Sequence, residues 1–279
     1  MTVTETAPRR PEAPAPAHDD WPGLLRAEWT KIRSVRSTIW SLIAFVVVAI
    51  GFSALIALVI SNTWNSPGSR DGHVQLHTDP TSVLYGAGFG FGQLALCVLG
   101  VIVITSEYST GAIRSSLLAV PRRLPMLAAK VLVFALLELV VSAITVFVVF
   151  FITTSILHSH ITITLGQPSV LRATIGGILY LVVLGLFAMA IGGLIRHTAG
   201  AIATVIGLVL VVPPLISLIP GTIANHIHGY FPTVAGQLVG QTIQEKGDVL
   251  SAWQGFGVFC LWTAVLLAGC AVLLTRRDA

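Results

Sequence analysis

The stretch TIWSLIAFVVVAIGFSALIALVI at residues 38–60 decides the fold class of this chain. It carries no charged side chain and is long enough to cross the hydrocarbon core of a bilayer as a helix, which takes about 20 residues. The run is too long for the apolar core of a secretory signal peptide, so we expect it to remain in the protein as a membrane span.

Five further apolar runs follow, and together they predict an all-α polytopic membrane protein. Hydrophobic residues make up 54% of the chain and charged residues only 10%, against about 25% charged residues in soluble domains. Mean hydropathy is +0.87. Helices are expected because lipid offers the backbone no hydrogen-bonding partner, and the alternating pattern of a membrane barrel is missing. The six predicted spans of a single transmembrane domain at 38–279 are 38–60, 84–105, 127–156, 173–195, 198–219 and 254–274.

The basic residues between the spans are sorted by side. Alternate connections place thirteen Lys and Arg residues on one side and only Arg70, Arg172 and Lys246 on the other. Cytoplasmic loops carry such an excess of positive charge, so both termini are predicted to be cytoplasmic. We expect a multi-pass protein of the inner or plasma membrane, that is, the cytoplasmic membrane. The thirteen are Arg9, Arg10, Arg26, Lys31, Arg33, Arg36, Arg114, Arg122, Arg123, Lys130, Arg196, Arg276 and Arg277. Contact with anionic lipid accounts for the net charge of +4, and nucleic-acid binding is not expected.

The chain ahead of the first span divides into two parts. Residues 1–20 are rich in Pro, Ala and charge, and we expect them to be a disordered cytoplasmic tail. Residues 21–37 predict an amphipathic interfacial helix with Trp21, Trp29 and Ile32 on its apolar face. Glu28 falls on that same face. Its carboxylate either pairs with a neighbouring cation or a partner protein, or extends out to water.

Two sequence features concern how the spans pack and bend. The pairs Gly86/Gly90 and Gly88/Gly92, and the series Ala199, Ala203 and Gly207, have the four-residue spacing of small residues that lets membrane helices approach closely. Pro213 and Pro214 are expected to kink or end the fifth span. The segment 220–253 is long and partly apolar. It forms either two short helices that dip back into the outer leaflet or a surface loop with one short helix.

The connection between the second and third spans predicts a short amphipathic helix at 107–120. Ser109 or Thr110 can cap it, and Pro121 stops it before a basic pair. The stretches EYSTGAIR at 107–114, LAVPRR at 118–123, RAEWTKIRS at 26–34 and RRDA at 276–279 resemble the permease subunits of the ATP-binding-cassette type-2 family. The resemblance extends from about Leu24 to Ala279.

This resemblance implies that 107–120 is a coupling helix seated in a groove of a separate ATPase subunit. Glu107, Gly111 and Arg114 are then the coupling positions, 21–37 is the connecting helix, and 220–253 is an external re-entrant segment. It implies a second permease copy as well, identical or related. No catalytic residue and no cofactor are expected.

An independent feature agrees with a separate ATPase. A phosphate loop needs a lysine directly after a glycine, and none of Lys31, Lys130 and Lys246 follows one. We therefore expect a permease that exports a substrate, such as an amphipathic drug, a peptide or a lipid-like molecule, with ATP hydrolysed by a partner chain.

The alternative function is an ion-coupled secondary transporter. Glu138 lies about 12 Å beyond Lys130 along a helix, inside the hydrocarbon, where an ionisable group indicates substrate contact or proton transfer. It is equally compatible with a protonated carboxyl that is hydrogen-bonded between helices. Six histidines in predicted external loops allow a metal site or a pH sensor, but solvated side chains are the simpler interpretation, and no metal site is predicted.

Overall fold

A computed structural model describes residues 21–66, 74, 76–110, 123–244 and 247–276. These residues form helices and connecting turns, and no strand occurs among them. Six of the described helices are long and apolar enough to cross a membrane. The protein is therefore an all-α polytopic membrane protein. The predicted tail at 1–20 lies outside the described residues.

The helices extend one or more residues beyond most of the predicted spans, because polar residues at each end continue the helical turn. The first helix, α1, covers Trp21–Ser34. The long helices are α2 (Arg36–Asn62), α4 (Pro80–Ser109), α6 (Arg123–Leu157), α7 (Pro168–Ile195) and α12 (Ala252–Arg276). The fifth span is composite, with α8 (Thr198–Ile206), a π-helical turn (Gly207–Val211) and α9 (Val212–Ser217). Between α9 and α12 lie α10 (Thr222–Gly229), α11 (Pro232–Gln237) and a 3₁₀ turn (Leu238–Gly240).

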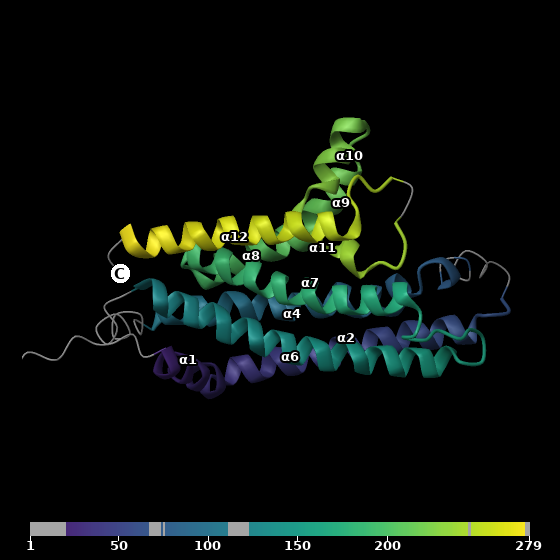
Figure 1. Ribbon diagram of the computed structural model, residues 1–279, viewed down its shortest axis with the longest axis horizontal. Coiled ribbons are helices and arrows are strands. Elements are labelled where there is room, and N and C mark those ends of the chain that lie inside the picture. The colour runs from purple at the N-terminus through teal and green to yellow at the C-terminus, as the bar shows by residue number, and fades with distance from the viewer. Residues whose placement is uncertain (1–20, 67–73, 75, 111–122, 245–246, 277–279) are drawn as a thin grey trace, which may run out of the picture.

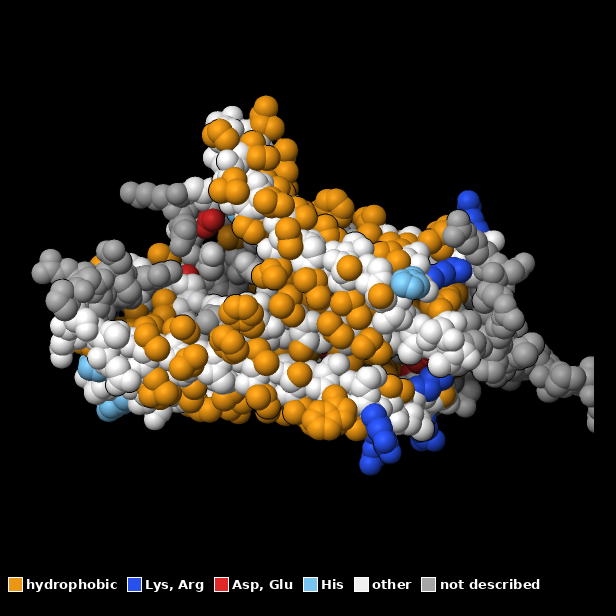
Figure 2. All heavy atoms as spheres, turned by 180° about the vertical axis from the view of Figure 1, so that it is seen from behind, with side chains coloured by type: hydrophobic (Ala, Val, Ile, Leu, Met, Phe, Trp, Pro, Cys, Tyr) orange, Lys and Arg blue, Asp and Glu red, His pale blue; other side chains and the backbone are white. Residues whose placement is uncertain are grey.

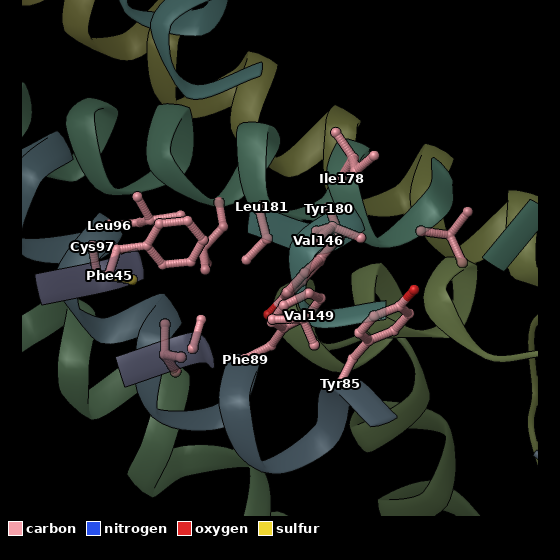
Figure 3. Close-up of a cluster of buried hydrophobic side chains, with 14 of the residues drawn as sticks. Phe45, Tyr85, Phe89, Leu96, Cys97, Val146, Val149, Ile178, Tyr180 and Leu181 are labelled. Carbon is pink, nitrogen blue, oxygen red and sulfur yellow. The ribbon is translucent and has the colours of Figure 1, made fainter. Parts of the chain in front are cut away.

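Helices α4 and α7 form the centre of the bundle. They are 61% and 67% buried over their most apolar windows, against 22% for α2 and for α12. Helix α4 packs on α2 and α7, and α7 packs on α6 and α12 (Figure 1). Their shared core includes Phe45, Leu96 and Leu181, which Figure 3 shows pointing toward one another from α2, α4 and α7.

The surface separates apolar and charged side chains along the bundle. Figure 2 shows hydrophobic side chains over the middle of the molecule and Lys and Arg gathered at one end. That end holds α1, the last turns of α4 and α12, and the first turns of α6 (Figure 1). Arg172, in the second turn of α7, lies at the opposite end. The two ends therefore differ in charge as the sequence predicts.

The glycine pairs of α4 have different environments although their spacing is the same. A Cβ added at Gly88 would lie 2.4 Å from the Ala49 carbonyl oxygen of α2, and one at Gly92 would lie 3.2 Å from the Ala49 Cβ. Gly88 and Gly92 thus permit the close contact predicted for them. A Cβ at Gly86 or Gly90 meets nothing within 4 Å. Among the described helices, that pair makes no close contact.

The fifth span bends where the sequence places its two prolines. A proline has no backbone N–H to donate, so the ladder of hydrogen bonds is interrupted ahead of Pro213 and Pro214, and the chain forms a π-helical turn there. Figure 1 shows α9 and α10 turning away from the direction of α8. Ala199 and Ala203 are exposed. A Cβ added at Gly207 meets nothing within 4 Å. Within the described part of the chain, this series therefore makes no close helix contact.

The segment between α9 and α12 contains two short helices, α10 and α11. Helix α11 packs against α12 and α7 through buried residues that include Thr233 and Ala235. The chain after it is held by Asp79, which caps α4 and accepts hydrogen bonds from the Thr242 backbone N–H at 2.9 Å and from the Thr242 hydroxyl. On the other side, Arg172 donates to the Gln241 carbonyl at 2.6 Å. This part of the chain is fixed to the bundle by side chains of α4 and α7.

Helix α1 ends at Ser34, three residues before the predicted boundary, and α2 begins at Arg36 after the extended residue Val35. Only Glu28 and Ile32 are buried on α1, where it packs on α6, whereas Trp21 and Trp29 are 43% and 48% exposed. The predicted apolar face of α1 therefore has a buried edge and an exposed edge. One edge contacts the bundle, and the tryptophans remain available to lipid.

Candidate functional site

Four charged side chains meet where α1, α4 and α6 come together, and we call them the base cluster: Glu28, Lys31, Glu107 and Lys130. The Lys130 Nζ lies 2.5 Å from Glu28 Oε2 and 2.7 Å from Glu107 Oε1. The Lys31 Nζ lies 2.7 Å from Glu28 Oε1 and 3.2 Å from Glu107 Oε1. Each ammonium group thus bridges both carboxylates, and positive and negative charges alternate around the cluster.

Three of the four residues of the base cluster are shielded from solvent. Glu28, Glu107 and Lys130 are 2%, 8% and 3% exposed. Ions in such a place are stable only when they are paired, because removal from water costs several kcal/mol per ion. Burial lowers the pKa of Lys31, but the hydrogen bond that Lys31 donates to Glu28 and the charges of Glu107 and Glu28 outweigh it, so the pKa is raised. Lys31 therefore stays charged at neutral pH, and the two lysines balance the two carboxylates.

The last turns of α4 are joined to further helices by neighbouring residues. The Thr198 hydroxyl of α8 donates to the Thr105 hydroxyl at 3.0 Å. The Arg196 guanidinium lies over the Tyr108 ring, 5.0 Å from its centroid, and donates to the Leu273 carbonyl of α12 at 3.0 Å. Arg196 has φ 58°, the left-handed conformation that ends α7. Residues 105–108 therefore connect α4 to α1, α6, α7 and α8, and through Arg196 to α12.

The structure brings two of the predicted site residues, Glu28 and Glu107, together, and it places Glu107 in a different helix from the one predicted. Of the two alternatives for Glu28, it shows the paired carboxylate. Glu107 was expected at the start of a separate helix with its carboxylate directed at a partner, but it lies in the last turns of α4 and bonds Lys130 and Lys31 of the same chain. Gly111 and Arg114, and the predicted helix beyond residue 110, lie outside the described residues.

Sequence reasoning missed Lys130 as a member of this site. In the sequence it was counted among the cytoplasmic basic residues and used to estimate the depth of Glu138, yet it lies in the second turn of α6 with its side chain buried. The available signal was its position ahead of a long apolar run, since a buried ammonium group requires a carboxylate partner. Glu28 and Glu107 lie 102 and 23 residues away. They are the acidic residues predicted near the same membrane face.

Glu138 lies apart from the base cluster, in the middle of α6. It is 0% exposed, and neither carboxyl oxygen has a hydrogen-bond partner among the described residues. Gly185 of α7 makes room for the carboxyl group, since a Cβ there would lie 1.8 Å from Oε2. The interhelical hydrogen bond that the sequence allowed is therefore not formed in the described part of the chain. An ionised carboxylate would be uncompensated here, so the neutral acid fits this site better.

The external histidines are scattered in the described part of the chain. His77, His158 and His226 are exposed, His228 is half-buried, and the His160 ring stacks on Trp64 with centroids 4.5 Å apart. His73 lies outside the described residues. Within these limits, no three His, Cys, Asp or Glu side chains are grouped so that they could hold a metal ion.

A bundle of apolar helices with charged residues confined mainly to its ends defines a multi-pass membrane protein. A family model described as ABC-2 family transporter protein matches residues 24–214, from α1 into α9. The chain belongs to this family, whose members are the membrane-embedded permease components of ABC transporters and work with ATPase activity in a separate subunit. A search of curated proteins finds no match.

Proposed function

We propose that this chain is the permease subunit of an ATP-driven exporter, works as half of a dimer, and moves an amphipathic substrate out across the cytoplasmic membrane. The observation that carries the proposal is the family match over residues 24–214. The six apolar helices support it, because they provide the transmembrane part that a soluble ATPase lacks. The second permease is an identical copy or a related chain.

The proposed orientation puts the basic end of the bundle in the cytoplasm. The predicted spans assign thirteen Lys and Arg residues to the side of the membrane on which this end lies, and three to the other side. The positive-inside rule then places both termini, α1 and the segment 107–120 in the cytoplasm. An ATPase that binds this segment would meet the same face as α1.

The proposed coupling runs through the base cluster. The segment 107–120 docks in a groove of the ATPase, with Glu107, Gly111 and Arg114 as coupling positions. In this proposal, Glu107 does not contact the ATPase directly but transmits its movement within the permease. Its carboxylate forms an ion pair with Lys130, which links the end of α4 to the start of α6, and Lys130 forms a second ion pair with Glu28 of α1. A push on the chain between α4 and α6 would therefore move three helices together and change access across the membrane.

The direct test is reconstitution with a cognate ATPase. The chain has no lysine that directly follows a glycine, as a phosphate loop requires. The permease alone in proteoliposomes should therefore show no ATPase activity above background, and hydrolysis and export should appear only with the partner subunit. An ATPase variant that binds but does not hydrolyse ATP is the control. Robust hydrolysis by the lone chain would overturn the proposal.

A second candidate function is ion-coupled transport with Glu138 as the proton-binding group. The observation that favours it is a fully buried carboxyl group with neither oxygen hydrogen-bonded among the described residues. Such a group inside a membrane commonly serves transport. This function would make Glu138 indispensable and the ATPase unnecessary.

A further inference from the structure

A pocket of about 180 Å³ lies at the end of the bundle opposite the base cluster, between α4, α7 and the chain that follows α11. One face of α4 forms its longest wall, with Ser82, Tyr85 and Phe89 among the lining residues. Tyr180 of α7 and Gln237 and Gln241 complete it. Figure 3 shows the Tyr85 and Phe89 side chains of α4 lying near Tyr180 of α7.

The deep part of the pocket is aromatic. Tyr85, Phe89 and Tyr180 are 4%, 8% and 4% exposed, and the Tyr85 and Phe89 rings stack with centroids 4.9 Å apart. The Tyr180 hydroxyl donates to Gln93 Oε1 at 2.8 Å and accepts from Gln237 Nε2 at 3.3 Å. These rings are thus held in place before any ligand arrives, and their faces suit an apolar chain or a flat ring.

The mouth of the pocket is polar and retains free hydrogen-bonding groups. Gln237 is exposed and Gln241 is half-buried. Within the described part of the chain, the Gln241 side-chain amide and Gln237 Oε1 make no hydrogen bond. Amide groups offer both donors and acceptors, so they match hydroxyl or amide groups of a ligand.

The lining residues carry no charge at neutral pH. Neither of the two nearby charged groups lines this pocket. The Asp79 carboxylate bonds Thr242 and Thr81. Arg172 bonds the Gln241 carbonyl through Nη2 and lines the neighbouring pocket, and its Nη1 has no hydrogen-bond partner in the described part of the chain. An anionic head group would therefore lose its hydration without gaining a cation. The pocket favours an uncharged ligand.

Two glycines leave space in the wall that α4 forms. Gly86 and Gly90 line the pocket, and a Cβ added at either meets nothing within 4 Å. On a helix these positions are one turn apart, so together they leave a shallow channel along α4. The volume is smaller than the roughly 300–1,000 Å³ of pockets that enclose a drug-sized molecule. It suits one head group with the first part of an attached chain.

We propose that this pocket binds the head group of an uncharged amphiphile that carries hydroxyl or amide groups, as an external substrate site of the permease. The head group bonds the amides of Gln237 and Gln241, and the adjoining apolar chain lies on Tyr85, Phe89 and Tyr180. That the ligand is a transported substrate rests on the export function proposed above. Binding itself does not depend on the ATPase.

The test is photolabelling of the full chain in lipid nanodiscs, without ATPase or ATP. The probe is decyl glucoside with a diazirine in its alkyl chain, used below its micellar concentration, and the comparison probe carries a phosphate in place of the glucose. The glucoside should label peptides that contain residues 80–93 or 237–241, and unlabelled decyl glucoside should compete. The phosphate probe should label them about tenfold less, as expected for a difference of about 1.4 kcal/mol.

Two variants add a side chain to the pocket at positions where a Cβ meets nothing within 4 Å in the described structure: Gly90→Leu and Gly86→Leu. Each should reduce pocket labelling about tenfold, since the added side chain occupies the space of the ligand. Gly257→Leu on α12 is the matched control, because its Cβ also meets nothing within 4 Å and it lies outside the pocket. Equal labelling by both probes, or full labelling of both pocket variants after normal purification, would overturn the proposal.

The same variants distinguish failure of this proposal from failure of the export function. If the pocket is labelled as expected but reconstitution with an ATPase gives no export, the binding site stands and only its role as a substrate site is overturned. If export proceeds and neither pocket variant alters labelling or export of the glucoside, the pocket proposal fails and the export function stands.

Discussion

The Lys130 Nζ of α6 lies 2.7 Å from the Glu107 Oε1 of α4, and this ion pair joins the two helix ends on either side of the segment 111–122. Both side chains are buried, so the pair is not screened by solvent. In a permease of this family, that segment is where we expect the ATPase to dock. The pair therefore holds together the two helix ends between which the proposed docking segment runs.

Substitution of Lys130 by methionine should destabilise the folded protein by about 3–5 kcal/mol, because the Glu28 and Glu107 carboxylates would share only Lys31. Thermal unfolding in detergent, followed by loss of the monodisperse peak, measures this. Arg33→Met on the exposed face of α1 is the matched control and should be near neutral. The double variant Lys130→Met with Glu107→Gln leaves one cation and one carboxylate and should recover part of the loss. A fully stable Lys130→Met protein would show that the cluster contributes little.

Glu107→Ala should leave the chain inserted and dimeric, yet weaken ATPase association or transport-linked hydrolysis about tenfold or more. The variant loses the bonds of Glu107 to Lys130 and Lys31, which join the end of α4 to α6 and α1 and through which we propose that the ATPase acts. Co-purification with the ATPase and stimulated hydrolysis are the measurements. Gly88→Leu, which disturbs the packing of α4 on α2 away from the base cluster, controls for general loss of stability. If both variants lower stability equally and neither affects the ATPase, Glu107 has only a structural role.

The spans were predictable because a long uncharged apolar run has few alternatives in lipid, and α2 covers the whole of residues 38–60. The base cluster was not predictable, because the partners of Lys130 lie 102 and 23 residues away and only the packing of α1 and α6 brings them together. The glycines of α4 show the same limit. Gly86 and Gly88 are both in four-residue pairs, but they face different directions, and only the position of α2 decides which pair is packed.

These glycines give a matched pair of stability variants. Gly88→Leu should disrupt the packing of α4 on α2, because its Cβ would lie 2.4 Å from the Ala49 carbonyl oxygen. Overpacking of this kind costs about 1–3 kcal/mol or more. Gly86→Leu, half a turn away, should leave stability unchanged. Unfolding temperatures in the same detergent compare the two, and equal effects would contradict the α2–α4 contact.

The orientation can be tested by cysteine labelling after Cys97, Cys260 and Cys270 are replaced by alanine. Single cysteines near 70, 160 and 240 should react with an impermeant reagent in intact cells, and those near 20, 115 and 278 only after permeabilisation. The charge difference between the two ends is the physical reason. Labelling at 115 from outside would contradict both the orientation and the proposed docking of an ATPase there.

Glu138→Gln separates the two candidate functions. Glutamine keeps the shape of the side chain and removes the ionisable proton, and Gly185 leaves space for it. In an ATP-driven exporter this variant should retain ATPase association and ATP-dependent export, because the neutral form already fits the buried site. Glu138→Asp, which shortens the side chain but retains the proton, is the matched control. Both variants should be assayed with and without a protonophore. If Glu138→Gln abolishes transport, Glu138→Asp and Glu107→Ala retain it, and the protonophore stops wild-type transport without ATP depletion, the protein is an ion-coupled transporter.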